Sequence, residues 1–161
     1  MIAFLSLGSN IGNRLDNLEE AFNIIIEEKI NIISKSKIYE TSPMENLNQN
    51  YFLNQVLKIE TNLEPFKLLD IIKGIENKMG RFKTKKKYMP RIIDIDILSY
   101  DNLIIDNNNL TIPHPKIKLR KFILKPWRDI APDYILSNSK STIKEHLERV
   151  SHLKDEVREY N

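Results

Sequence analysis

Two aspartates in one short apolar stretch are the first residues of the chain that could do chemistry. Asp94 and Asp96 stand one residue apart in PRIIDIDIL, at positions 90–98. Alternate side chains of a β-strand share a face, so both carboxylates point the same way while the intervening isoleucines form an apolar face. At a rise of about 3.3 Å per residue, the carboxylates lie about 7 Å apart. Because unpaired like charges are costly when partly buried, the pattern predicts a cation between them.

A second interpretation of the two aspartates is structural. Charged side chains on an edge strand discourage pairing with other strands, and two aspartates on a solvated face need no ligand. The stretch by itself leaves this interpretation open beside that of a metal site.

The composition limits the chemistry that is available. The chain has 161 residues, of which 41% are hydrophobic, enough for one domain with a core. It has no cysteine, so any metal must be held by oxygen or imidazole ligands. The opening MIAFLSLG is typical of a first strand rather than a signal peptide, and no apolar run is long enough to cross a bilayer. We therefore expect one soluble, cytoplasmic domain over residues 1–161, with no membrane partner.

Cations precede the aspartates along the chain. Arg81 and Lys83 lie in the basic stretch RFKTKKKY, and Arg91 follows it directly before the aspartate pair. Such cations can hold a polyphosphate against metal bound by carboxylates, and phosphoryl transfer needs little beyond positioning and charge neutralisation. Neither GxxxxGK[ST] nor GxGxxG occurs in the chain. Hard oxygen ligands favour magnesium.

The elements that must position these residues follow from periodicity and capping signals. Strands are predicted at 2–7, 32–39, 52–60 and 92–98, and helices after Asn13, from Pro65 to Gly80, and over 142–150. The order βαββαβ predicts an α+β fold with a ferredoxin-like antiparallel sheet, helices on one face, and additional C-terminal elements.

Further motifs accompany the aspartate stretch. They are GSNIGNR and NLEEA near the start, YETSP at 39–43, FLN at 52–54, IE and MGR within 75–81, LTIPHP at 110–115, RKFIL and DIAP. Together these motifs cover nearly the whole chain, and they occur in the order that is typical of one enzyme family. The chain resembles the 6-hydroxymethyl-7,8-dihydropterin pyrophosphokinases of folate biosynthesis.

The resemblance implies transfer of a pyrophosphoryl group from ATP to the hydroxymethyl group of the pterin, with release of AMP. It implies two magnesium ions held by Asp94 and Asp96, with Arg81 and Arg91 on the phosphates. It places Phe52 and Phe122 on the two sides of the pterin ring. The implied pterin-binding residues are Thr41, Pro43, Met44, Phe52, Asn54 and Phe122.

The same resemblance implies an ATP site and small molecules as the only partners, with no nucleic acid and a monomeric enzyme. The implied ATP-binding residues are Lys73, Glu76, Lys83, Arg91, Ile97, Thr111, His114 and Arg120.

Five positions depart from the family's usual pattern. They are Lys83, Tyr88, Met89, Asn109 and Pro115. A lysine does not reproduce the bidentate fork of an arginine on phosphate, so these departures bear on ATP affinity and on loop 81–90. We expect that loop to be mobile in the free protein and to close over a bound triphosphate.

Two other classes of protein compete with this interpretation. An RRM-like RNA-binding module has a similar order of elements, but the chain lacks the aromatic K/R-G-F/Y-G/A-F signature. A ferredoxin-like nuclease or cyclase would explain the aspartate pair but not the pterin-type loop motifs.

Overall fold

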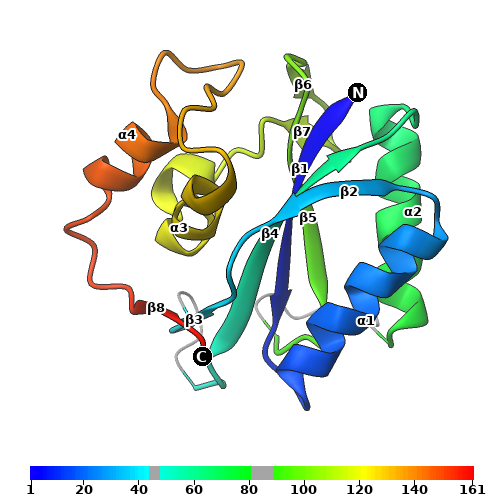
Figure 1. Cartoon of the computed structure of the whole chain (residues 1–161), viewed down its shortest axis with the longest axis horizontal. Helices are drawn as coiled ribbons and strands as arrows, with labels where there is room; N and C mark the ends of the chain where they lie inside the picture. Colours follow the sequence, from blue (N-terminus) through cyan, green and yellow to red (C-terminus); the bar gives the residue numbers. More distant parts are fainter. Residues whose placement is uncertain (44–47, 81–88) are drawn as a thin grey trace.

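An antiparallel sheet lies between two layers of helices (Figure 1). The computed structural model describes residues 1–43, 48–80 and 89–161. The strands are β1 (Ile2–Ser9), β2 (Asn31–Lys35), β3 (Tyr39–Thr41), β4 (Phe52–Glu60), β5 (Asp94–Tyr100), β6 (Ile105–Asp106), β7 (Thr111–Ile112) and β8 (Val157–Glu159). The helices are α1 (Arg14–Glu27), α2 (Pro65–Lys78), α3 (Lys121–Ile130) and α4 (Ile143–Arg149), with a 3₁₀ turn at Ile117–Leu119.

The main sheet has the order β5-β1-β4-β3-β8, and β2 also pairs with β4. Every pairing is antiparallel. In the middle of the sheet Gly8 of β1 lies opposite Asn54 of β4 on one side and Asp94 of β5 on the other. A separate hairpin is formed by β6 and β7. The prediction of a mixed fold with an antiparallel sheet is confirmed.

The helix boundaries follow their capping residues. Asn13 caps α1 and its side chain accepts a hydrogen bond from the amide of Asp16. Pro65 occupies the first turn of α2, and Gly80 lies just beyond the helix end with a φ of +88°, where a residue without Cβ is favoured. Thr142 begins α4 with a capping box that includes Glu145.

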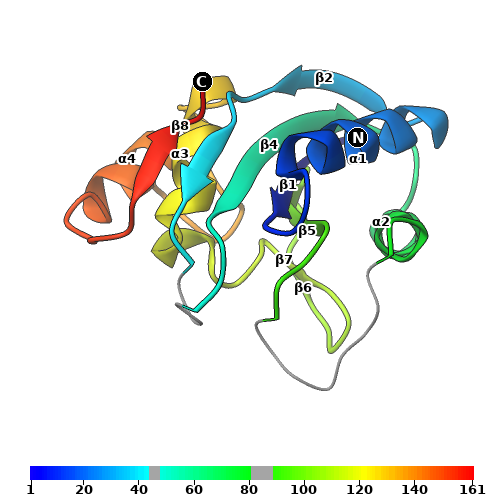
Figure 2. The same cartoon turned by 90° about the horizontal axis from the view of Figure 1, so that it is seen from below.

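Alternation along the strands produces two apolar cores, one on each face. On the first face, Ile93, Ile95 and Ile97 pack against α1 and α2, as their alternation with the aspartates predicts. On the second face, Phe4 and Leu98 pack under α3 and α4. Figure 2 shows α1 and α2 on one side of the twisted sheet and α3 and α4 on the other.

The second helical layer differs from the expectation of helices on one face only. The cause lies in β1, β4 and β5, which carry apolar residues on both faces and so need cover on both. Helix α3 was not predicted, because Pro126 lies inside it and proline is unfavourable in a helix interior. The short strand β8 was not predicted either.

The strand predicted over 32–39 is divided into β2 and β3 around Ser36. There the hydroxyl of Ser36 accepts from the amide of Val56 at 3.0 Å, and the Ser36 amide donates to the Val56 carbonyl at 2.9 Å. A serine side chain thus replaces one backbone partner of β4. Beyond the break, β3 pairs with the first residues of β4, next to the site described below.

Candidate functional site

One cavity of about 350 Å³ opens on the second face of the sheet, beside α3. Its floor is formed by the polar ends of the strands, and its sides by the segments after β3 and before α3. Nine of the residues predicted for the site line it, namely Thr41, Pro43, Phe52, Asn54, Arg91, Asp94, Asp96, Arg120 and Phe122. The structure therefore brings the aspartates together with the implied pterin-binding residues that it describes.

The aspartates face this cavity because their strand alternates. Asp94 lies opposite Gly8 and Asp96 opposite Ser6 in the β1–β5 pair, so each carboxylate has a small neighbour. Their side chains are 20% and 33% exposed. Solvent and ligands can thus reach both carboxylates. A role in discouraging strand pairing at an edge does not account for the position of both aspartates in a cavity with the other lining residues.

Cationic groups surround the pair. Arg91 donates a hydrogen bond to Asp94. A guanidinium nitrogen of Arg120 lies 4.0 Å from Asp96, and Nε2 of His114 lies 3.9 Å from the same carboxylate. Burial lowers the pKa of His114, and this effect outweighs the opposing pull of Asp96. The imidazole is therefore biased toward its neutral form.

Asn10 fixes the segment that carries Arg91, a role that nothing in the sequence indicates beyond its place in GSNIGNR. Its side chain is 1% exposed and accepts from the amide of Arg91 at 2.7 Å. The backbone N–H of Asn10 donates to the Arg91 carbonyl at 3.1 Å. Its Nδ2 also donates to the side chain of Gln49 at 3.0 Å and to the carbonyl of Asn50 at 3.3 Å. Asn10 thus ties three segments around the cavity.

A buried polar recess lies at the β3–β4 side of the cavity. Asn54 donates to the hydroxyl of Thr41 at 2.7 Å, and both side chains are nearly inaccessible, at 4% and 2%. A side chain at the position of Gly8 would be crowded, because its Cβ would lie 3.0 Å from Oδ1 of Asn54. Phe52 and Phe122 reach the cavity from β4 and α3 respectively. The recess combines two polar side chains with two aromatic rings.

Glu76 and Lys73 occupy a different position from the cavity lining. Glu76 is 2% exposed, and its carboxylate accepts from the amide of Ile95 at 2.7 Å and pairs with Lys73 at 2.9 Å. Ile95 is the residue between the two aspartates. The carboxylate of Glu76 therefore holds the outer edge of β5 at the point where that strand carries Asp94 and Asp96.

Other predicted ATP-binding residues lie outside the cavity lining. The side chain of Ile97 belongs to the first core, so only its backbone can contact a ligand. Thr111 lies on β7, and His114 follows it with its amide bonded to the carbonyl of Leu98 at 2.9 Å. The predictions for Met44, Arg81, Lys83 and Tyr88 fall on residues outside the described part of the chain.

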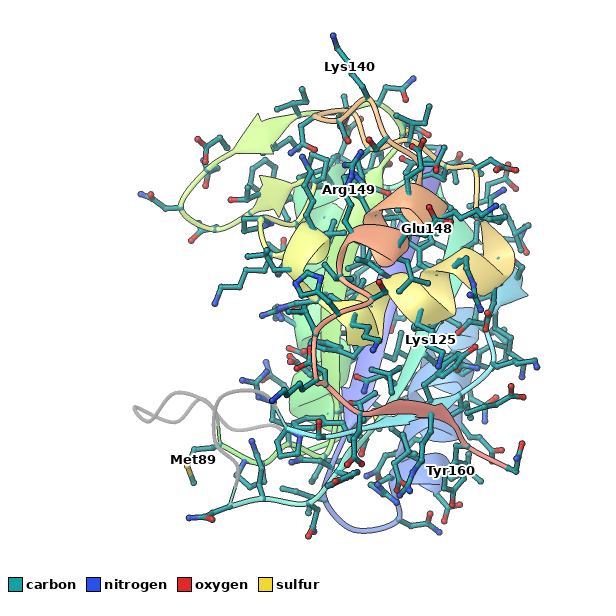
Figure 3. The ribbon with its side chains drawn as sticks, turned by 90° about the vertical axis from the view of Figure 1, so that its left-hand side faces the viewer. Met89, Lys125, Lys140, Glu148, Arg149 and Tyr160 are labelled. Atoms are coloured by element: carbon teal, nitrogen blue, oxygen red, sulfur yellow. The ribbon has the colours of Figure 1, made fainter. Side chains whose placement is uncertain are left out.

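Several lining residues were not predicted, and Met89 appeared only as a departure from the family pattern. The additional lining residues are Ser6, Gly8, Ser42, Gln49, Met89, Lys116 and Leu119. Met89 projects from the body of the protein in Figure 3. Within residues 1–43, 48–80 and 89–161, no group of three or more His, Asp or Glu side chains could hold a metal ion by itself. No helix in the described residues is long and apolar enough to cross a membrane.

Comparison with known proteins places this geometry in a family. Residues 4–132 match the family described as 7,8-dihydro-6-hydroxymethylpterin-pyrophosphokinase (HPPK). The chain belongs to the HPPK family. It is 38% identical over 138 residues to the 2-amino-4-hydroxy-6-hydroxymethyldihydropteridine pyrophosphokinase of Haemophilus influenzae, covering 85% of this chain and 86% of that protein. The Bacillus subtilis protein of the same name is 38% identical over 130 residues, covering 80% and 77%.

Other HPPK relatives are much longer proteins. A folic acid synthesis protein of Dictyostelium discoideum is 44% identical over 134 residues, which are 83% of this chain but 20% of that protein. The chain likewise spans 20% of the folic acid synthesis protein of Schizosaccharomyces pombe. Among solved structures, Plasmodium falciparum HPPK-DHPS is similar in fold, with a TM-score of 0.76 and 21% identity over 95% of this chain and 45% of that one.

The position of Glu76 generates a prediction for this HPPK family member. Glu76→Ala leaves the buried amide of Ile95 without its acceptor, so we expect the free energy of unfolding to fall by about 1 to 3 kcal/mol. Urea unfolding measures this loss, and amide hydrogen exchange at Ile95 locates it. Glu76→Gln keeps an acceptor oxygen and is the matched control. If the two variants were equally stable and equally protected, Glu76 would not be the residue that holds β5.

Proposed function

We propose that this chain transfers a pyrophosphoryl group from ATP to 6-hydroxymethyl-7,8-dihydropterin, forming the pterin diphosphate and AMP. One observation carries the proposal: a single cavity joins the aspartate pair to the polar recess between Thr41 and Asn54. The first half suits a triphosphate, and the second suits a flat heteroaromatic ring. The names of the H. influenzae and B. subtilis relatives agree with this activity.

The recess explains how a pterin could be selected. Thr41 and Asn54 are buried polar groups, so a ligand that lacks matching donors and acceptors would leave them unsatisfied, which is a strong basis for discrimination. Phe52 and Phe122 offer ring faces from two different elements. We infer that the pterin lies between these rings with its hydrogen-bonding edge toward Thr41 and Asn54. Pro43 shapes the rim, and the predicted backbone contact of Met44 lies outside the described residues.

The aspartate end of the cavity provides the charges for the transfer. Arg91 and Arg120 flank the carboxylates and can donate hydrogen bonds to the phosphate oxygens as the pterin hydroxyl attacks the β-phosphorus. The bond from the β-phosphorus to the oxygen of the departing AMP breaks, and the hydroxyl proton leaves to solvent. Holding both substrates in one cavity aligns the two reacting groups and keeps competing water away.

Magnesium fits the donor set at this end. Two carboxylates share a face and remain partly exposed, and magnesium is usually held by one or two carboxylates with water and phosphate oxygens completing its shell. We propose that Asp94 and Asp96 hold two such ions. When bound, magnesium supplies charge neutralisation and polarisation of the triphosphate.

For ATP itself, we propose that Lys73, the backbone of Ile97, Thr111 and His114 border the nucleoside. The side chain of Lys73 is 43% exposed, so a ligand can reach its ammonium group. The position of Glu76 supports a role in holding this edge rather than a direct contact with ATP.

The finer features of the fold belong to the same proposal. The chain order β1, α1, β2 with β3, β4, α2, β5 and the neighbours β5-β1-β4 support a ferredoxin-like unit to which α3, α4 and β8 are added. Because both cores share β1, β4 and β5, we infer a single domain over 1–161. We also propose a monomer in the cytoplasm, since described residues of one chain line the cavity and ATP is supplied there.

A direct product assay tests the activity. The protein is incubated with ATP, magnesium and 6-hydroxymethyl-7,8-dihydropterin, and AMP and pterin diphosphate are quantified together. We expect equal amounts of both products and no AMP when the pterin is omitted. AMP release that does not depend on the pterin would contradict the proposal.

The aspartate pair gives the second prediction. We expect Asp94→Asn and Asp96→Asn each to lower kcat by about a hundredfold or more, because each removes a carboxylate that would hold magnesium, the group that neutralises the charge of the phosphates. The thermal midpoint should change little, since both side chains are partly exposed. Asp106→Asn removes the same charge from the exposed hairpin strand β6 and is the control. A stable Asp94 variant with normal AMP release would remove the role proposed for the pair.

The aromatic walls give the third prediction. Phe122→Ala should weaken pterin binding much more than ATP binding, since ring stacking contributes about 0.5 to 1.5 kcal/mol beyond area burial. Fluorescence titration with 6-hydroxymethylpterin and calorimetry with a non-hydrolysable ATP analogue measure the two affinities. Phe122→Leu preserves apolar packing of α3 against the second core and separates stacking from stability. Equal losses for both ligands would assign Phe122 to packing alone.

A further inference from the structure

The C-terminal segment 156–160 lies beyond the residues that match the HPPK family, yet it contacts both sides of the cavity. Its strand β8 pairs with β3, with Val157 opposite Thr41 and Arg158 opposite Glu40. Figure 3 shows β8 below α3, with Tyr160 beyond the strand. Thr41 lines the polar recess, and β8 is the strand paired with it.

Glu156 fastens the two chain segments that lead into and out of the recess. Its carbonyl accepts from the amide of Ser42 at 3.1 Å, and its amide donates to the hydroxyl of Ser42 at 3.3 Å. Its carboxylate accepts from the hydroxyl of Tyr51 at 3.0 Å. Ser42 directly follows Thr41, and Tyr51 directly precedes Phe52. One residue of the C-terminal segment therefore holds both segments.

Arg158 adds an ion-pair network on the same side. Two of its guanidinium N–H groups donate to Glu40 at 2.7 and 3.1 Å, and Arg14 donates to the other oxygen of Glu40 at 2.8 Å. Arg14 also donates to the carbonyl of Tyr51 at 2.8 Å. The hydrogen bond from Arg158, followed by that from Arg14, holds the pKa of Glu40 below its usual range against the effect of burial. Glu40 is thus ionised at neutral pH and joins α1, β3 and β8.

The same segment is also bonded to α3. The ammonium of Lys125 donates to the carbonyl of Val157 at 2.7 Å. Just before the segment, the ammonium of Lys121 donates to the carbonyl of Leu153 at 3.4 Å. Lys121 directly precedes Phe122. Figure 3 places Lys125 on the helix above β8. Val157 therefore touches β3 through its strand pairing and α3 through Lys125.

We propose that residues 156–158 act as a brace that sets the separation between β3 and α3, and with it the fit of the recess between Thr41 and Phe122 for its ligand. The inference rests on the proposed function in naming that ligand a pterin. Glu156 and Arg158 do not line the cavity, so their effect is positional. Without these contacts the distance between β3 and α3 is less well fixed, which weakens pterin binding. The aspartate end of the cavity, on β5, is unaffected.

The chain offers a matched set of variants. Arg158→Met keeps the aliphatic stem and removes the pairing with Glu40, and Tyr51→Phe removes only the hydroxyl that binds Glu156. Lys37→Met is the control. Lys37 pairs with Glu159, which lies on β8 next to Arg158, at 2.8 Å, and both side chains are exposed, at 61% and 43%. That pair lies at the other end of the β3–β8 ladder from Thr41.

The measurements are the dissociation constants for 6-hydroxymethylpterin and for a non-hydrolysable ATP analogue, the KM for each substrate, and the thermal midpoint. We expect Arg158→Met and Tyr51→Phe to raise the pterin constants about three- to tenfold, which matches the net contribution of one ordinary hydrogen bond, because these side chains act on the recess only through its position. ATP constants should stay within about twofold, and Lys37→Met should match the parent protein. Equal changes for both ligands, or the same change in Lys37→Met, would overturn the brace.

Hydrogen exchange separates failure of the brace from failure of the proposed function. If the parent protein binds no pterin, the proposed function is wrong. The brace is then judged by amide exchange over residues 41–43 and 51–54, which should be faster in Arg158→Met than in Lys37→Met. Identical exchange in the two variants would show that residues 156–158 do not hold these segments.

Discussion

The second face of the sheet is only partly covered by helices, and the cavity depends on this. Where β1, β4 and β5 carry Phe4, Val56 and Leu98, α3 and α4 lie over them and complete a core. Further along the same strands the residues become small or polar, and no helix lies over them in the described structure (Figure 1). Burying the apolar half stabilises the fold, and leaving the polar half open provides the site. A helix extended over Asp94 would have had to bury two carboxylates.

Strand edges and loops around the open half are held by buried polar side chains rather than by further strands. Glu76 satisfies the outer edge of β5 from α2, and Asn10 bonds the segment of Arg91 to the loop that precedes β4. Each is nearly inaccessible and bonded to backbone groups. Because buried polar groups are costly when unpaired, these contacts favour one arrangement of Asn50, Arg91 and Ile95. The described part of the cavity rim is thus held by side-chain hydrogen bonds.

How much of this the sequence could predict depends on the range of the interaction. Local rules sufficed for the shared face of Asp94 and Asp96 and for the starts of α1, α2 and α4, since periodicity and capping act within a few residues. They failed for α3, where tertiary packing overrides Pro126, and for β8, whose three residues are ordered by pairing with a strand more than a hundred positions earlier. The residues proposed to bind the pterin could be predicted only from the family resemblance, because Phe52 or Phe122 alone indicates ordinary core packing. Asn10 and Glu40 act through distant partners, which no local pattern reveals.

The bond between Asn54 and Thr41 limits how this protein can evolve. The same two side chains that face the recess also join β3 to β4, and a Cβ added at Gly8 would crowd the side chain of Asn54. A substitution that altered the chemistry of the recess would break a buried contact of the sheet at the same time. Ligand preference and folding stability are therefore selected together at these positions. A chain under pressure to exclude an inhibitor from the recess has few single-residue routes that leave it folded.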